Sequence, residues 1–187
     1  MRQLFLEALL SDYLKEFEDE GDRIAPLFQA FRDPNVMKRC HSPGHITATG
    51  ILLSRDSMLL IQHPGLDCLL PPGGHVESGE QPKDAVLREV WEEVGVRCRA
   101  HEWHESRAFP FDIDIHQIPE NADKNEPAHL HYDFRYIVMD TQQVRSRAEL
   151  PNLWIPLNEV CGSGMVRLRQ KIRNRVWPIG QSARPDV

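Results

Sequence analysis

The sequence predicts an α/β fold with a helical extension at its N-terminus. Apolar residues follow two patterns along the chain. They first recur every three or four residues, which is typical of helices, and later alternate with polar residues, which is typical of strands. The helical repeat comes first, over residues 3–19, and strand-like segments begin near residue 45. A length of 187 residues is enough for one full hydrophobic core.

Two helices are expected before the strands. The first, over residues 3–19, carries an apolar face made of Leu6, Leu9, Leu10, Tyr13, Leu14 and Phe17. The second is expected from about Asp22 to Phe31, ending before Asp33-Pro34. Together they form the extension that we assign to residues 1–40 and expect to pack on the core.

The core opens with a predicted strand pair and closes with a predicted helix. Residues 45–54 and 58–63 are apolar segments joined by a Ser-Arg-Asp-Ser turn. Residues 162–177 follow a Gly-Ser-Gly breaker and are expected to form a helix. Because residues 162–187 hold six basic residues and one acidic residue, we expect that helix to present a solvated basic face.

Composition excludes several functional classes. The formal charge of −6 disfavours a basic nucleic-acid binder, because affinity for a phosphate backbone comes mostly from Lys and Arg. No segment approaches the roughly 18 apolar residues of a membrane span, and the N-terminus lacks the features of a secretory signal. The four cysteines form no Cys-x-x-Cys pair, so we expect reduced, mostly buried thiols and a cytoplasmic protein.

A concentrated acidic motif lies at residues 74–96. Pro82 suits the first turn of a helix and Gly95 suits its C-terminal cap. Between them, Glu89, Glu92 and Glu93 share an arc of about 100° on the helix. Such crowding of like charges costs stability, and hard oxygen ligands for Mg²⁺ or Mn²⁺ would explain it. An ordinary solvated acidic face is the alternative.

The spacing of the whole motif is similar to that of a known family. Nine positions match the Nudix box G-x5-E-x7-R-E-U-x-E-E-x-G-U, where U is bulky and aliphatic: Gly74, Glu80, Arg88, Glu89, Val90, Glu92, Glu93, Gly95 and Val96. The chain therefore resembles the MutT-like Nudix hydrolases. This resemblance implies a Nudix fold, an α/β/α sandwich with a mixed β-sheet, over a domain that we place at residues 41–178, before a tail at 179–187.

The resemblance also implies a chemistry and a role for each box residue. Members hydrolyse nucleoside diphosphates linked to another moiety, with water attacking phosphorus and Mg²⁺ or Mn²⁺ as cofactor. By this likeness the metal ligands are Glu89, Glu92, Glu93 and the Gly73 carbonyl, while the catalytic residues are Glu89, Arg88 and Glu80. Glu89 is a candidate general base, although some members use a carboxylate from a distant loop, for which Glu126 and Glu149 are candidates here.

A second constellation accounts for part of the unusual total of nine histidines. Residues 111–116 and 129–136 alternate strictly, so that each segment gathers polar side chains on one face. We expect these strands to pair, directly or through a neighbour, and to contact the substrate through Asp112, Asp114, His116, His129, His131 and Asp133. A general base, an extra metal site or plain His–Asp hydrogen bonds on a polar sheet face are the other interpretations.

The remaining histidines have less context. His75 lies inside the box and is also a candidate for substrate binding, and His45 opens the first core strand. The other four are expected at the surface or at helix caps: His41, His63, His101 and His104. Trp154, in the WIPLNEV segment, is expected in the core.

The subfamily is not assignable from motifs outside the box. The expected partner is a small-molecule diphosphate of nucleotide type, with no nucleic acid and no membrane. Dimers are frequent in the family, so a homodimer is also considered. The alternatives are a non-catalytic Nudix-fold sensor or regulator, which would commonly have an eroded box, and an isopentenyl diphosphate isomerase, whose Cys-x-His-Pro setting is not matched by residues 40–43.

Overall fold

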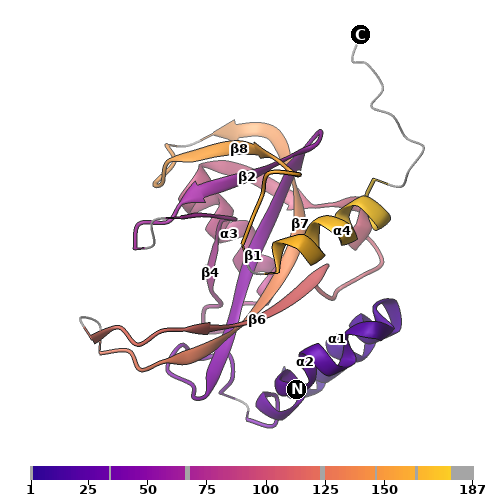
Figure 1. Cartoon of the computed structure of the whole chain (residues 1–187), viewed down its shortest axis with the longest axis vertical. Helices are drawn as coiled ribbons and strands as arrows, with labels where there is room; N and C mark the ends of the chain where they lie inside the picture. Colours follow the sequence, from indigo (N-terminus) through magenta and orange to yellow (C-terminus); the bar gives the residue numbers. More distant parts are fainter. Residues whose placement is uncertain are drawn as a thin grey trace.

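A twisted mixed sheet lies at the centre of the protein, with helices on both of its faces (Figure 1). The computed structural model describes residues 2–33, 35–65, 68–122, 125–145, 147–162 and 164–177. Its helices are α1 (Arg2–Glu16), α2 (Gly21–Ala30), α3 (Pro82–Val94) and α4 (Met165–Arg175), with short 3-10 turns η1 (Glu18–Glu20) and η2 (Glu102–His104). Its strands are β1 (Gly44–Ser54), β2 (Ser57–Gln62), β3 (Leu69–Leu70), β4 (Gly73–His75), β5 (Val96–Ala100), β6 (Asp112–Ile118), β7 (His129–Arg145) and β8 (Asn152–Pro156).

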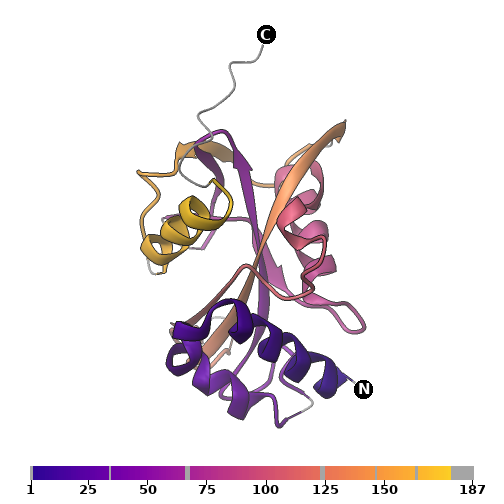
Figure 2. The same ribbon diagram turned by 90° about the vertical axis from the view of Figure 1, so that its right-hand side faces the viewer.

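The sheet is built around two long neighbouring strands, β1 and β7. The main path of the sheet is β3-β2-β1-β7-β5, while β4 pairs with β1, β6 with β7 and β8 with β2. The strands β1 and β7 run parallel, and the other pairs are antiparallel. Figure 2 shows α3 on one side of these strands and α4 on the other. The predicted α/β/α sandwich with a mixed sheet is confirmed.

The two segments with alternating polar residues, now β6 and β7, pair directly with each other, which is one of the two arrangements expected. β6 and β7 form an antiparallel ladder in which Asp114 lies opposite Asp133 and His116 opposite His131. Paired residues in a ladder project to the same face of the sheet. The polar side chains of the two strands therefore share one surface.

The neighbours of Gly50 in β1 show on which face of the sheet this polar surface lies. A methyl group added at Gly50 would meet the side chains of Val90 and Val86 on α3. Even-numbered residues of β1 therefore face α3, and odd-numbered ones, including His45, face the opposite side. Since His45 pairs with His131 in the parallel ladder, the polar surface of β6 and β7 lies on the side of α4.

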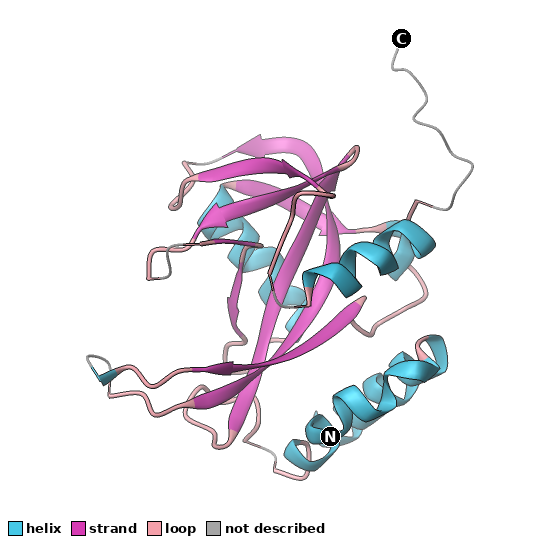
Figure 3. Ribbon diagram, viewed as in Figure 1, coloured by secondary structure: helices cyan, strands magenta, loops and turns pink. Residues whose placement is uncertain are grey.

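The N-terminal helices join the core of the sheet domain. Figure 3 shows α1 and α2 lying together at one side of the sheet. The apolar face predicted for the first helix is buried, apart from the half-buried Leu14. Phe17 contacts the rings of Trp103 and Phe111, each with centroids 6.2 Å away. The residues of both helices therefore belong to one continuous hydrophobic core.

Three expectations about burial are wrong, each for a local reason. Cys40, Cys68 and Cys161 are exposed, since all three lie in connecting segments, and Cys98 is half-buried. Trp154 is 44% exposed because β8, which carries it, pairs with β2 alone among the described strands.

The third concerns His104. Its side chain is buried because its Nε2 accepts a hydrogen bond from the backbone N–H of Ile137. His101 caps η2 as expected, since its Nδ1 accepts from the N–H of Trp103. Within the described ranges, no helix is long and apolar enough to cross a membrane.

Candidate active site

Helix α3 positions the acidic residues of the box. Pro82 occupies its first turn, and Gly95 ends it in a left-handed conformation (φ 73°) with its N–H bonded to the Trp91 carbonyl. Val86, Val90 and Val94 are buried against the sheet. The opposite edge of the helix keeps its glutamates half-buried or exposed, so they can reach a ligand.

Arg88 ties the carboxylates of the box together. Its Nε and Nη2 donate to both oxygens of Glu80, at 3.0 and 2.9 Å. Its Nη1 donates to Glu89 (2.8 Å) and to Glu92 (3.2 Å), and Nη2 also donates to the His75 carbonyl (2.9 Å). The hydrogen bonds between Arg88 and Glu80 raise the pKa of Arg88 and lower the pKa of Glu80. Burial opposes both shifts. Arg88 thus orients the acidic cluster and stays charged.

Two of the glutamates are held in an environment that disfavours their charge. Burial raises the pKa of Glu93 to about 7, and the negative charges of Glu89, Glu149 and Glu92 raise it as well. The Gly73 N–H, which donates to Glu93 at 2.9 Å, opposes this rise. Burial also raises the pKa of Glu89 despite its bond from Arg88. A cation between these carboxylates would relieve both penalties.

The glycines before the helix allow the backbone to approach these carboxylates. A methyl group at Gly74 would lie only 2.5 Å from Oε1 of Glu89, and one at Gly73 would lie 2.5 Å from the Ala48 carbonyl oxygen. The structure therefore brings the backbone of Gly73 and Gly74 to the glutamates. The role of the Gly73 carbonyl as a ligand stays a prediction.

Glu149 is the loop carboxylate that comes near the box. The backbone N–H groups of Glu149 and Leu150 donate to the carbonyls of Glu92 and Glu93, at 3.4 and 3.1 Å. Its charge contributes to the raised pKa of Glu93. Glu126, the other candidate, instead pairs with Arg39. Glu149 is therefore the loop residue placed to act with the box.

The predicted substrate-binding aspartates lie in a buried ion network instead of an open groove. Arg135 donates to Asp133 (2.9 Å), Asp114 (3.1 Å) and Asp112 (3.4 Å). Arg167 binds both oxygens of Asp112, at 3.2 and 3.0 Å, and also donates to Asp114 at 3.0 Å. Although burial opposes the effect, the charges of Lys171, Arg167 and Arg135 lower the pKa of Asp112. The pKa of Asp114 is also lowered against burial, by its hydrogen bond with His116 and by Arg135 and Arg167. A substrate-binding role for the three aspartates stays a prediction.

The cations of this network were missed by the sequence reasoning. The basic face of α4 was expected to be solvated, but its Lys171 is buried and donates to Asp112 (2.9 Å) and to the Tyr13 hydroxyl (2.8 Å). Arg167, from the same helix, points to the same carboxylates. A signal for Arg135 was available, because it follows Asp133 by two residues and so shares its face of the strand.

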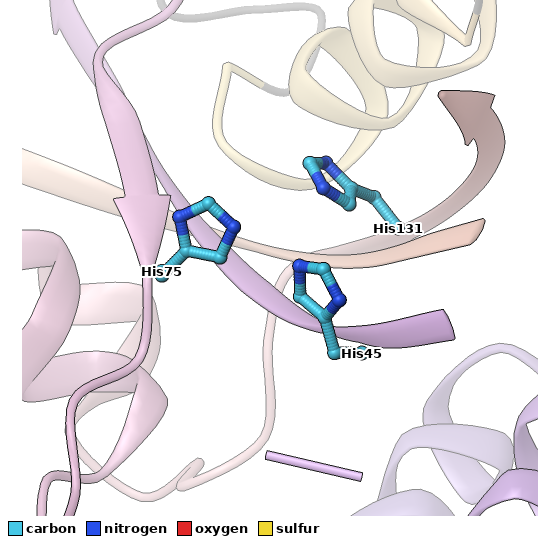
Figure 4. A group of neighbouring side chains, drawn as sticks. All are labelled: His45, His75 and His131. Carbon is cyan, nitrogen blue, oxygen red and sulfur yellow. The ribbon is translucent and has the colours of Figure 1, made fainter. Parts of the chain in front are cut away.

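The four histidines predicted to bind substrate lie together in the structure, and His45, which was not among them, lies with them. The histidine cluster consists of His45 (β1), His75 (β4), His116 (β6), His129 and His131 (β7). His45 is central, with its ring centroid 4.9 Å from that of His75, 5.0 Å from His129 and 4.8 Å from His131. Figure 4 shows the rings of His45, His75 and His131 converging from three strands.

Burial keeps the inner members of the histidine cluster neutral at pH 7. It lowers the pKa of His45 and of His75 to about 4, with neighbouring charged groups adding to the effect. Burial and the surrounding histidines lower the pKa of His131 further. Each neutral ring therefore has one nitrogen with an available lone pair. The substrate-binding role expected for His75, His116, His129 and His131 stays a prediction.

Comparisons with known proteins find a matching family model and a related curated protein. The model of the NUDIX domain family matches residues 44–177. A probable DHNTP pyrophosphohydrolase from Lactococcus lactis is 35% identical over 114 residues, which are 61% of this chain and 65% of that relative, so the chain spans less than two thirds of its length.

Two solved structures share the fold. A NUDIX-family hydrolase from Clostridium perfringens has a TM-score of 0.50 at 19% identity, with 70% of this chain and 97% of that chain covered. A UDP-X diphosphatase has a TM-score of 0.50 at 12% identity, with 86% of this chain and 81% of that chain covered. At these identities the two structures support the architecture alone.

Proposed function

Because the chain belongs to the Nudix hydrolase family, we propose that it hydrolyses the diphosphate linkage of a nucleoside diphosphate joined to another moiety, with Mg²⁺ or Mn²⁺ as its cofactor. Nudix hydrolases generally use divalent metals. The observation that carries the proposal is the convergence of Glu89 and Glu93, both with raised pKa, on the backbone of Gly73 and Gly74.

The donor set fits a hard divalent cation. Glu89, Glu92 and Glu93 offer carboxylate oxygens, the ligands that Mg²⁺ and Mn²⁺ prefer, and the carbonyl of Gly73 is the proposed fourth donor. A bound ion would stabilise the charge that develops on the diphosphate oxygens. Arg88 holds Glu80 and Glu89 in place through three hydrogen bonds and donates two more, to Glu92 and to the His75 carbonyl.

Two carboxylates are candidates to take the proton from the attacking water. Glu89 lies against the glycine turn of the box, with its Oε1 2.5 Å from the position of a methyl group at Gly74, and Arg88 holds it there. Glu149 is exposed and lies beside Glu93 through its backbone bond to α3. We propose Glu89 as the base and Glu149 as the alternative. Replacing each by Gln separates them, because only the loss of the base removes the fall in rate on the acidic side of the pH–rate profile, where that carboxylate becomes protonated.

We assign Asp112, Asp114 and Asp133 a positioning role. Their charges are already engaged with Arg135, Arg167 and Lys171, which leaves them little capacity for a diphosphate that is itself anionic. By binding α4 to β6 and β7 they hold one layer of the sandwich on the sheet. The substrate would then be recognised by other groups.

The experiment that tests the function is a substrate screen with matched variants. Nucleoside diphosphate derivatives, together with DHNTP as the compound in the relative's name, are incubated with the full chain and Mg²⁺ or Mn²⁺. Wild-type protein is expected to release products from at least one compound. Glu89→Gln and Glu93→Gln are expected to lower kcat about 10²- to 10⁴-fold.

Glu77→Gln is the control, because Glu77 lies in the loop of the box before α3, at a position that the box motif leaves free, and its side chain is exposed. This variant is expected to keep wild-type turnover. Tight nucleotide binding without turnover of any compound would contradict the hydrolase proposal and favour a ligand sensor on the same fold.

A further inference from the structure

The histidine cluster lies on a different face of the sheet from the box glutamates. A methyl group at Gly74 points to Glu89 of α3, so the next residue, His75, projects to the opposite face. His45 and His131 project to that same face, because Thr47 pairs with both His75 and Asp133 in the ladders of β1. The cluster is therefore separate from the glutamates, and its chemistry needs its own explanation.

His45 is the clearest sign that something is missing from the cluster. Its side chain is only 1% exposed, and neither Nδ1 nor Nε2 has a hydrogen-bond partner among the described residues. A buried polar group without a partner costs about 1–3 kcal/mol, so such groups are rare in native structures. The rings of three other histidines surround the ring of His45. The missing partner is therefore expected to be a group that several imidazole nitrogens can bind at once.

The spacing of the ring nitrogens suits a metal ion. One nitrogen each from His45, His75 and His131 can be chosen so that all three lie within 4.8 Å of one another. Two ligands about 2.1 Å from the same ion lie at most about 4.2 Å apart, so closure needs only small rotations of the rings. The Nε2 atoms of His129 and His131 are 3.3 Å apart, close to the edge of about 3.3–3.4 Å of a tetrahedron with zinc at its centre.

An outer contact orients the ring of His129 in the way that a metal ligand usually needs. Nδ1 of His129 lies 2.8 Å from the Pro127 carbonyl, to which it would donate, leaving the lone pair on Nε2 for a ligand of the cluster. Metal-binding histidines typically donate their second ring N–H to a carbonyl or a carboxylate.

We propose that His45, His75 and His131, with His129 as the fourth ligand, form a second metal site that takes Zn²⁺ or a similar borderline divalent ion. Imidazole nitrogens suit Zn²⁺, Co²⁺ and Ni²⁺, whereas Mg²⁺ prefers oxygen ligands. The site is independent of the proposed hydrolysis, since no glutamate of the box belongs to it. His116 lies outside the four ligands, with its ring centroid 5.5 Å from that of His131.

Metal titration of the full chain tests the proposal directly. The protein is stripped with a chelator and kept in excess Mg²⁺, so that the oxygen ligands of the box are occupied, and Zn²⁺ or Co²⁺ is then added. We expect one ion per chain, with Co²⁺ giving the visible absorption of a four-coordinate site. His131→Gln is expected to weaken binding by more than about 10²-fold, because it removes a direct ligand.

Controls separate this site from the box and from surface histidines. Glu89→Gln and His63→Gln are expected to keep full Zn²⁺ binding, since His63 belongs to the turn after β2 and not to the cluster. Because a variant at a buried histidine can lose its fold, the imidazole ¹⁵N shifts of the wild-type protein are measured as well, and four rings are expected to shift with added Zn²⁺. Absence of a bound ion, or Zn²⁺ binding lost in Glu89→Gln and kept in His131→Gln, would overturn the proposal.

Discussion

Two glutamates of the box, Glu89 and Glu93, are costly to ionise in the folded chain, because burial raises the pKa of each. Glu93 is half-buried beside three other carboxylates, and the N–H of Gly73 is the backbone group that donates to it. Arg88 compensates Glu80 and Glu89 more fully than it compensates Glu93. Glu93 is therefore the residue at which the need for a cation should be easiest to measure.

Stability of the metal-free protein should fall as pH rises because of Glu93. Its pKa is about 7 in the folded chain and 4.5 for an unperturbed glutamate, so the folded chain binds more protons between these values, and unfolding becomes easier as pH rises through this window. Relative to wild type, Glu93→Gln should gain about 1–2 kcal/mol in unfolding free energy between pH 4.5 and 8, allowing for screening at this half-buried site. Urea unfolding in a chelator measures it. A gain that does not vary with pH would contradict the account, and Glu77→Gln should follow wild type.

Gly74 is a second residue whose effect should be local. The three atoms nearest to a methyl group there all belong to the flexible carboxylate end of Glu89, so Gly74→Ala should leave the fold intact while displacing that carboxylate. We expect kcat to fall at least about 10²-fold with a change in unfolding free energy below about 1 kcal/mol. Steady-state kinetics and urea unfolding measure the two effects.

Gly73→Ala is the contrasting variant. Its methyl group would clash with the backbone of Ala48 and Thr49 and should lower stability as well as activity. Wild-type turnover in Gly74→Ala would contradict the close approach of Gly74 to Glu89.

At the scale of elements, α4 is attached to the sheet by charges as well as by apolar packing. Asp112 is fully buried and contacts Arg135, Arg167 and Lys171, which come from a strand and a helix far apart in the sequence. Buried ion pairs of this kind contribute little net stability, but removing one partner leaves an uncompensated charge. The network therefore fixes where α4 lies on the sheet.

Arg135→Met tests this attachment. The substitution keeps a long side chain but leaves Asp133 and part of the charge of Asp114 without their cation, so we expect a loss of about 3–5 kcal/mol in unfolding free energy. Arg173→Met, on the exposed face of α4, is the matched control and should change stability by less than about 0.5 kcal/mol. Equal effects of the two substitutions would show that the network does not hold the helix.

Elements with a local signature could be predicted from the sequence. The α3 helix could be located from Pro82, Gly95 and three glutamates at helical spacing, and the polar faces of β6 and β7 from their alternation. Contacts between distant elements could not. The meeting of His45 with His75 depends on the register of β1 and β4, and the inward direction of Lys171 depends on carboxylates that only the folded sheet brings beneath α4.

For the whole molecule, the net charge of −6 combines opposite local excesses. The box holds six acidic and two basic residues, and a cation is proposed to bind there. Part of the basic excess near the C-terminus is turned inward by α4, through Arg167 and Lys171. The N-terminal helices take part in the same structure, because Tyr13 of α1 accepts a hydrogen bond from Lys171 and packs in the common core. The box, the sheet and α4 thus form one folded unit with the extension.

Hydrolysis in ¹⁸O-labelled water tests the central claim most directly. The full chain is incubated with the substrate found in the screen, with Mg²⁺ and without it, and the products are weighed by mass spectrometry. We predict metal-dependent cleavage that places one ¹⁸O atom in the phosphate of one of the two products. Cleavage that needs no metal, or label in a product outside its phosphate, would contradict the claim.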